Sequence, residues 1–243
     1  MHILEIISTE IPPEKAFRGN FRSSKVYHDS EDNSLSSDRK QLGSGHYSTA
    51  KANKDPHLIT KYKKNFSDTE KDPYWEYVDM VINNKLWENP YFPRIYKKHT
   101  YVDQKNQKLP KVEMEKLDGS ATLNKKEVEY LIEKIVDPSS NLFSENVKSH
   151  FPEDKWYPYN MTRIICRIIM ANVIGFKKAS VYAEGKEIDI DTRIKDTKLI
   201  QAIKALIEFR KYHPTASVDL HTGNVMVRRG PTGVQLVLTD PFS

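Results

Sequence analysis

The sequence predicts an α+β fold in which an antiparallel sheet with one helix is followed by a mainly helical region. Residues 42–117 contain five short β-like segments and one helical pattern. From about residue 118 onward apolar residues recur at helical spacing, and the last part of the chain indicates a loop followed by a β-hairpin. We therefore divide the chain into an N-terminal extension (1–41), a first lobe (42–117) and a second, helical lobe (118–243).

The elements of the first lobe are short and separated by turn residues. One strand is broken by the glycines at residues 42–45, and a helix at 73–87 is stopped by Asn89-Pro90. The other expected strands cover residues 47–51, 58–62, 95–102 and 111–117. In the second lobe, helices are expected around residues 128–135, 161–173 and 199–207, and hairpin strands at 225–227 and 234–238.

Composition limits the class of protein. Hydrophobic residues make up 38% and charged residues 29% of the chain, and no apolar run approaches the roughly 20 residues of a membrane-spanning helix. We expect a cytoplasmic protein with no membrane partner, in which the single Cys166 is a reduced core residue. The net charge of +5 is compatible with nucleotides or acidic proteins, but no arginine-rich helix or zinc-finger spacing predicts direct nucleic-acid binding.

The most informative motif is Asp-Leu-His-Thr-Gly-Asn at residues 219–224, with Asp240 following at the end of an apolar strand. Phosphoryl transfer from ATP needs a carboxylate that accepts or orients a proton, and oxygen ligands that hold magnesium against the phosphates. An Asp five residues before an Asn, with a hairpin that returns a second Asp, is the spacing of a kinase catalytic loop and its metal ligand. An isolated Asp or Asn would equally be a turn residue.

A second motif, Leu-Gly-Ser-Gly at residues 42–45, is typical of a loop that approaches phosphate closely, because glycine has no β-carbon to block the approach. Ser48 stands where the usual pattern has a third glycine, and a plain hairpin turn would explain the same residues. Lys61 ends the β-like run that follows and is the candidate phosphate-binding lysine, with Lys63 and Lys64 as rivals. Its expected partner is Glu76 on the next helix, with Glu70 as the alternative.

These motifs resemble the protein-kinase-like superfamily, which includes the aminoglycoside and choline phosphotransferases. They resemble still more closely the early serine/threonine protein kinases of T-odd coliphages and related podoviruses. It rests on residues 42–48, 59–64, 216–226 and 239–241, which occur in the family's order and frame residues 42–241. The resemblance implies a bilobal, protein-kinase-like fold with a truncated helical lobe, and phosphorylation of host proteins of transcription and RNA processing in the host cytoplasm.

The same resemblance implies the cofactors ATP and Mg and a role for each site residue. The catalytic residues are Asp219, Lys61 and His221, where His221 either touches the transferred phosphate or caps the loop. Residues that contact the nucleotide are Leu42, Gly43, Ser44, Gly45, Lys61, Glu76, and the hinge residues Met114 and Glu115, although residues 112–117 would also be a plain sheet strand. The metal ligands are Asn224 and Asp240.

The chain departs from ordinary protein kinases in three ways. Ser217-Val218 replaces the His-Arg pair before the catalytic Asp, so regulation through an activation-loop phosphate is not expected. The metal motif is Asp240-Pro241-Phe242, without the usual glycine. We expect no activation loop or substrate-binding subdomain after it, so protein substrates would be recognised by the middle helices, by residues 1–41, or elsewhere.

Three functions remain open from the sequence. The first is a serine/threonine protein kinase that acts on host proteins and on its own serine-rich segment at residues 23–37. The second is a small-molecule kinase of the aminoglycoside type, favoured by the histidine in the motif at 219–224. The third is a non-catalytic kinase-like module that binds a partner, favoured by the incomplete glycine loop.

Overall fold

The computed structural model describes residues 40–44, 48–64, 73–103, 106–152, 154, 156–183, 185–231 and 233–243. The serine-rich segment at 23–37, Gly45 of the glycine loop and Glu70 lie outside the described residues.

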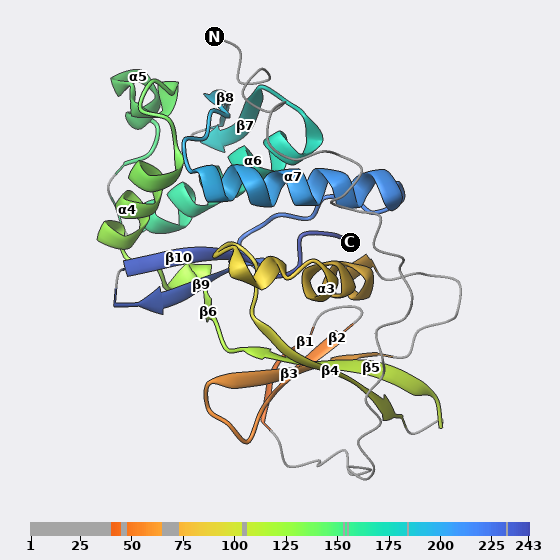
Figure 1. The fold of residues 1–243 in the computed structure, drawn as a ribbon. Helices are drawn as coiled ribbons and strands as arrows, with labels where there is room; N and C mark the ends of the chain where they lie inside the picture. Colours follow the sequence, from red (N-terminus) through yellow and green to blue (C-terminus); the bar gives the residue numbers. More distant parts are fainter. Residues whose placement is uncertain are drawn as a thin grey trace.

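A five-stranded antiparallel sheet forms one end of the molecule (Figure 1). Its strands are β1 (Gln41–Ser44), β2 (Ser48–Ala52), β3 (Leu58–Lys63), β4 (Ile95–Val102) and β5 (Lys108–Glu115). They lie in the order β1-β2-β3-β5-β4, so β3 is central and is bonded on both edges. This confirms the predicted strands, although β5 begins at Lys108 rather than at residue 111.

Helix α3 (Pro73–Asn83) packs an aromatic face into the core. Tyr74, Trp75 and Tyr77 are all buried. The helix is shorter than the predicted span of 73–87, because Lys85 adopts a left-handed conformation with φ 52° that ends the α-helical hydrogen-bonding pattern. The short 3₁₀ turn η1 (Leu86–Glu88) follows it.

The second half contains the predicted helices. These are α4 (Lys125–Ile135), α6 (Tyr157–Ile174) and α7 (Thr197–Tyr212), with the short α5 (Glu145–Lys148) and the 3₁₀ turns η2 (Ser120–Thr122) and η3 (Asn141–Phe143). Asn124 and Glu127 form a reciprocal capping box at the start of α4. Gly175 ends α6 with φ 95°, a conformation that glycine adopts without a steric penalty.

A hairpin of β7 (Lys178–Ala183) and β8 (Lys186–Asp191) lies within the region that the sequence predicted to be helical. Its strands alternate: Ala179 and Val181 of β7, which packs against α6, and Ile190 of β8 are buried, and the residues between them are more exposed. Gly185, with φ 76°, supplies the turn. The prediction missed this hairpin because the alternating pattern is short and is flanked on both sides by strong helical patterns.

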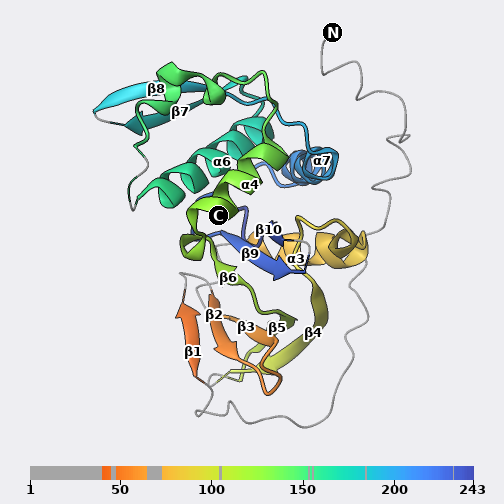
Figure 2. The same ribbon diagram turned by 90° about the vertical axis from the view of Figure 1, so that its left-hand side faces the viewer.

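A second sheet positions the motif residues. It consists of β6 (Asp118–Gly119), β9 (Val225–Gly230) and β10 (Gly233–Leu238) in the order β10-β9-β6. Figures 1 and 2 show α3 and the β9–β10 hairpin between the five-stranded sheet and helices α4, α6 and α7. The predicted C-terminal hairpin is thus confirmed, and it lies where both halves of the chain meet.

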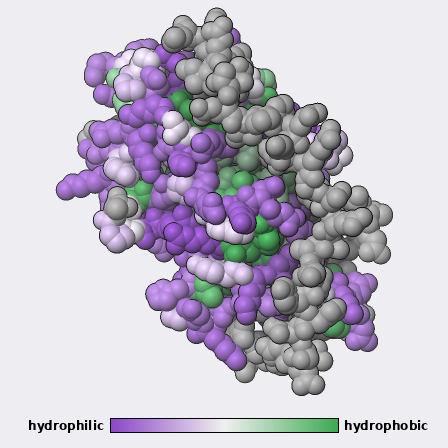
Figure 3. All heavy atoms as spheres, viewed as in Figure 1, coloured by the Kyte–Doolittle hydropathy of each residue, from purple (hydrophilic) through white to green (hydrophobic). Residues whose placement is uncertain are grey.

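The described residues on the face in Figure 3 are mostly hydrophilic, with smaller hydrophobic areas among them. Within the described part of the chain, no helix has the length and apolar character needed to cross a membrane.

Candidate functional site

Lys61 and Asp240 form the centre of the candidate site. Lys61 Nζ lies 2.8 Å from Asp240 Oδ2, which is the geometry of a charge-assisted hydrogen bond. The side chains are 15% and 29% exposed respectively, so the pair is shielded but open to solvent on one side. Lys61 is held by the central strand β3, and Asp240 follows β10.

Asp219 and Asn224 form the second half of the site. The side-chain amide of Asn224 donates from Nδ2 to the carbonyl oxygen of Asp219 at 2.8 Å and to its Oδ2 at 3.1 Å. The amide nitrogen of Asn224 is therefore directed at Asp219, and its Oδ1, on the other branch of the amide, points away from these two acceptors. The predicted five-residue spacing brings these two side chains into direct contact.

The main chain joins the two halves. The carbonyl oxygen of Asn224 accepts from the Thr239 backbone N–H at 3.0 Å, the Thr239 hydroxyl at 2.8 Å and the Asp240 backbone N–H at 3.4 Å. Asp219 donates its own N–H to the carbonyl oxygen of Pro241 at 2.9 Å. Residues 219–224 are thereby tied to the segment that carries Asp240, and the three predicted polar residues form one bonded unit.

His221 lies at the exposed edge of this loop. Its Nδ1 accepts the backbone N–H of Gly223 at 3.0 Å, which places the proton of a neutral imidazole on Nε2. Nε2 is 3.7 Å from Asp219 Oδ1, too far for a direct hydrogen bond. A β-carbon at Gly223 would lie 2.7 Å from Cε1 of His221, so a side chain there would displace the imidazole.

Glu76 does not pair with Lys61, contrary to the sequence-based expectation. Its Oε2 is 2.7 Å from Nδ1 of His213, which follows α7, and the His213 ring stacks on Phe209. Instead, Nζ of Lys61 forms an ion pair with Asp240 and lies over the ring of Tyr74, with 3.3 Å between Nζ and the ring centroid. The aromatic contact offsets part of the cost of partly burying the ammonium group.

Tyr74 and Tyr77 are neighbours of the site that sequence reasoning missed. Tyr77 is fully buried and donates its hydroxyl proton to the carbonyl oxygen of Leu238. Burial raises the pKa of Tyr77 well above its usual range, and the nearby Tyr74 and Asp240 raise it further. Tyr77 therefore stays protonated and fastens α3 to the strand that leads to Asp240. The sequence feature that could have indicated them is a pair of bulky aromatic residues about one turn apart in a short helix.

Met114 and Glu115, which the resemblance predicts to be hinge residues, have structural contacts of their own. Met114 is buried, and its sulfur accepts a 3.8 Å contact from the hydroxyl of Tyr74. The carboxylate of Glu115 is bound by the guanidinium of Arg228 through both oxygens, and it also accepts the Arg94 backbone N–H at 2.8 Å. The backbone N–H of Glu115 donates to the carbonyl oxygen of Arg94 at 3.0 Å, so contact between Glu115 and a nucleotide would have to come from its main-chain carbonyl oxygen.

Three of the four predicted glycine-loop residues are described. Leu42 is exposed on β1, Gly43 pairs with Ala50, and Ser44 pairs with Thr49 of β2. They lie on the edge of the sheet, two strands from Lys61. The strand placement agrees with the expectation, and the tip of the loop lies outside the described residues.

The metal ligands expected from the sequence can be tested by their donor atoms. No group of three or more His, Cys, Asp or Glu side chains in the described ranges is arranged to hold a metal ion. Asp240 offers a partly exposed carboxylate, and Asn224 offers Oδ1, since its amide nitrogen is directed at Asp219. Two oxygen donors fit Mg²⁺ when the remaining positions are filled by phosphate oxygens and water.

The sequence matches no protein-family model, and a search of curated proteins gives no significant match.

Proposed function

We propose that this chain is an ATP- and magnesium-dependent phosphotransferase with a bilobal, protein-kinase-like fold, and that it acts as a serine/threonine protein kinase on host proteins. The observation that carries the proposal is the meeting of Lys61, Asp219, Asn224 and Asp240 in one bonded unit. Lys61 comes from the first sheet and the other three from the C-terminal loop and hairpin. Packing of an ordinary core does not require a lysine, two aspartates and an asparagine at one partly exposed position.

Each residue has a distinct task in this proposal. Lys61 binds phosphate oxygens of ATP, and Asn224 Oδ1 and the Asp240 carboxylate hold Mg²⁺. Bound Mg²⁺ neutralises charge on the phosphates. Asp219 accepts the proton of the substrate hydroxyl as its oxygen bonds to the γ-phosphorus and the bond to ADP breaks.

A small-molecule kinase is the second candidate, and His221 is the observation that favours it. Its Nδ1 is occupied by Gly223, so Nε2–H faces outward beside Asp219. Ordinary protein kinases have a lysine at this position, and aminoglycoside phosphotransferases often have a histidine.

The decisive experiment uses the purified chain with γ-labelled ATP and Mg²⁺, alone and with a bacterial lysate. Asp219→Asn keeps the size of the side chain and removes its charge. Glu187→Gln, at an exposed position of β8, is the matched control. Labelled proteins that disappear with Asp219→Asn and persist with Glu187→Gln would support the protein kinase.

The other outcomes separate the alternatives. ADP release that depends on Asp219 without any labelled protein would support the small-molecule kinase. Neither label nor ADP release, in a chain shown to be folded by circular dichroism, would contradict the proposed catalysis and favour a binding module. Mapping of labelled sites would show whether residues 23–37 are targets of self-phosphorylation.

A further inference from the structure

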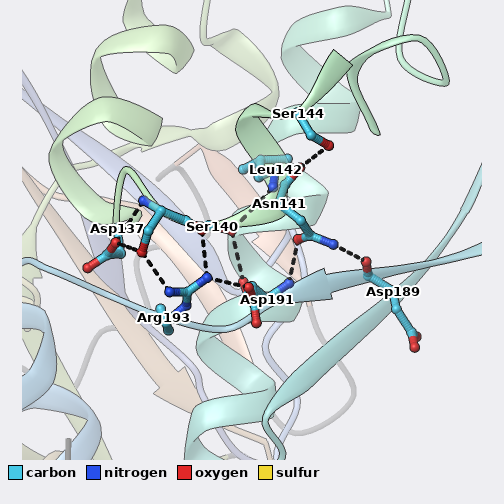
Figure 4. A network of polar contacts seen from close by, with 9 residues as sticks. Asp137, Ser140, Asn141, Leu142, Ser144, Asp189, Asp191 and Arg193 are labelled. Atoms are coloured by element: carbon cyan, nitrogen blue, oxygen red, sulfur yellow. Dashed lines mark hydrogen bonds and ion pairs between the residues drawn. The ribbon is translucent and has the colours of Figure 1, made fainter. Parts of the chain in front are cut away.

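The two edges of the β7–β8 hairpin differ in whether their outward backbone groups are hydrogen-bonded. The edge of β8 is sealed by Asn141, whose Nδ2 donates to the carbonyl oxygen of Asp189 at 2.8 Å and whose Oδ1 accepts the N–H of Asp191 at 2.8 Å (Figure 4). One side chain thus imitates the hydrogen bonds of a neighbouring strand. An edge strand with bare backbone groups would otherwise pair with another chain.

The same contacts show which backbone groups of β7 face outward. In an antiparallel pair of strands, the backbone N–H and C=O groups of two directly opposed residues either bond to each other or both point away from the pair. The backbone groups of Asp189 and Asp191 point away from β7, toward Asn141. The backbone N–H and C=O of their partners, Ser180 and Lys178, therefore point away from β8 on the other side of the hairpin. By the same alternation Tyr182 also presents its N–H and C=O to the outside of β7. None of these outward groups bonds to another described residue.

Basic side chains of α6 lie next to this open edge. A small hollow of about 40 Å³ lies between the two elements, and Arg163, Arg167, Ser180 and Tyr182 are among the residues that line it. Both arginines are exposed, and neither forms an ion pair or hydrogen bond with a described residue. The guanidinium of Arg163 lies over the ring of the exposed Tyr159, with 5.8 Å between Cζ and the ring centroid.

The spacing of the two arginines matches an extended peptide. Residues four apart on a helix are separated by about 6 Å along the axis. Side chains on one face of a strand repeat every second residue, about 6.8 Å. Two carboxylates at alternate positions of a strand beside β7 could therefore each meet one guanidinium.

We propose that the open edge of β7, with Arg163 and Arg167 of α6, binds an extended acidic peptide segment that adds to the hairpin as a third strand. Backbone hydrogen bonds to Ser180 and Tyr182 supply affinity without regard to sequence. The arginines supply selectivity for acidic side chains at positions i and i+2, because a guanidinium matches the planar carboxylate. The lining includes neither Lys61 nor Asp219, so this surface is separate from the proposed phosphotransfer site.

The binding test uses a fluorescein-labelled peptide, Thr-Glu-Val-Glu-Thr, and fluorescence anisotropy at low ionic strength. Two control peptides have the same length: Thr-Gln-Val-Gln-Thr lacks the charges, and Thr-Glu-Glu-Val-Thr places them on opposite faces of a strand. We expect binding of the first peptide and about tenfold weaker binding of both controls, since exposed ion pairs contribute modestly and are screened by salt. Equal binding of all three peptides, or no binding of the first, would overturn the proposal.

Two pairs of variants separate side-chain from backbone recognition. Replacing both arginines, Arg163→Gln with Arg167→Gln, should weaken binding about tenfold. The control, Lys198→Gln with Lys204→Gln, removes the same charge from exposed positions of α7 and should not. Ser180→Pro removes one outward N–H that the hairpin itself does not use and should abolish binding, whereas Ser180→Ala keeps that N–H and should bind as the unmodified chain does.

Circular dichroism shows whether each variant is folded, and the peptide test needs neither ATP nor Mg²⁺, so its result is independent of phosphotransfer. Unchanged binding by folded Ser180→Pro would exclude strand addition. A single-stranded oligothymidylate that binds in place of the acidic peptide would also overturn the proposal and identify a nucleic-acid surface instead.

Discussion

Lys61 and Asp240 are 179 positions apart in the sequence, and their side chains are joined by a 2.8 Å ion pair. The pair connects the central strand of the first sheet to the segment after β10. The ion pair can therefore form only when the two halves of the chain have packed together.

Asp240→Asn should reduce phosphate transfer at least about a hundredfold, because the change removes the charge of a proposed metal ligand while keeping its shape. The measurement is turnover of γ-labelled ATP beside Glu187→Gln. Near-normal turnover in Asp240→Asn would show that this carboxylate is not part of the reaction.

Lys61→Met should raise the KM for ATP and lower kcat/KM at least about tenfold, since an ammonium group that binds phosphate would be lost. Lys63→Met and Lys64→Met are the matched controls, because both lysines lie within three positions of Lys61. If Lys61→Met were silent and a control impaired, the phosphate-binding role would belong to that neighbour.

Arg228→Met should lower the free energy of unfolding by about 3–5 kcal/mol, because the change leaves the carboxylate of Glu115 buried without its partner. The two side chains are 16% and 9% exposed. Urea unfolding followed by circular dichroism measures the change. The double variant with Glu115→Gln should recover part of the loss, and a single variant as stable as the unmodified chain would contradict the assigned ion pair.

The Glu127→Gln variant should lose about 1 kcal/mol of stability near pH 7 and much less near pH 3. The guanidinium of Arg229 holds the pKa of Glu127 below its usual value, and the backbone N–H of Asn124 lowers it further. A lowered pKa stabilises the folded state above the ordinary pKa of about 4.5, and this contribution is lost as the pH falls through the folded value. A stability difference that is the same at both pH values would show that Glu127 carries no such linkage.

Cys166 should resist iodoacetamide at pH 8 in the folded chain and react once the chain is unfolded in urea. Burial raises the pKa of its thiol to about 12, so the reactive thiolate is scarce. Mass spectrometry of the alkylated protein measures both states. Rapid modification without urea would mean that the region around Cys166 opens readily.

The sequence predicted the strands and helices that have strong periodic patterns. The aromatic and aliphatic residues of α3 and the isoleucines of α6 recur at spacings that only a buried helical face explains. The β7–β8 hairpin was missed because two short alternating segments between long helices carry a weak signal. Its formation depends on the surface that α6 offers to Ala179 and Val181 of β7, which is a tertiary contact.

The local part of the candidate site was predictable, and its distant partners were not. The contact between Asp219 and Asn224 follows from their spacing in one loop. The pairing of Glu76 with His213 and of Lys61 with Asp240 depends on how α3, α7 and β10 pack, and spacing in the sequence contains no information about those distances. Likewise, nothing local to Glu115 indicates that Arg228 will enclose its carboxylate.

The Glu115–Arg228 contact also has a consequence for synthesis on the ribosome. Arg228 donates to Glu115 and to the carbonyl oxygens of Pro90 and Phe92, all of which are translated more than a hundred residues earlier. At about 5–20 residues per second, the earlier segments wait for roughly 5–30 seconds before this arginine emerges. During that interval the carboxylate of Glu115 lacks its arginine partner, so complete burial of this part of the first sheet has to follow the synthesis of Arg228.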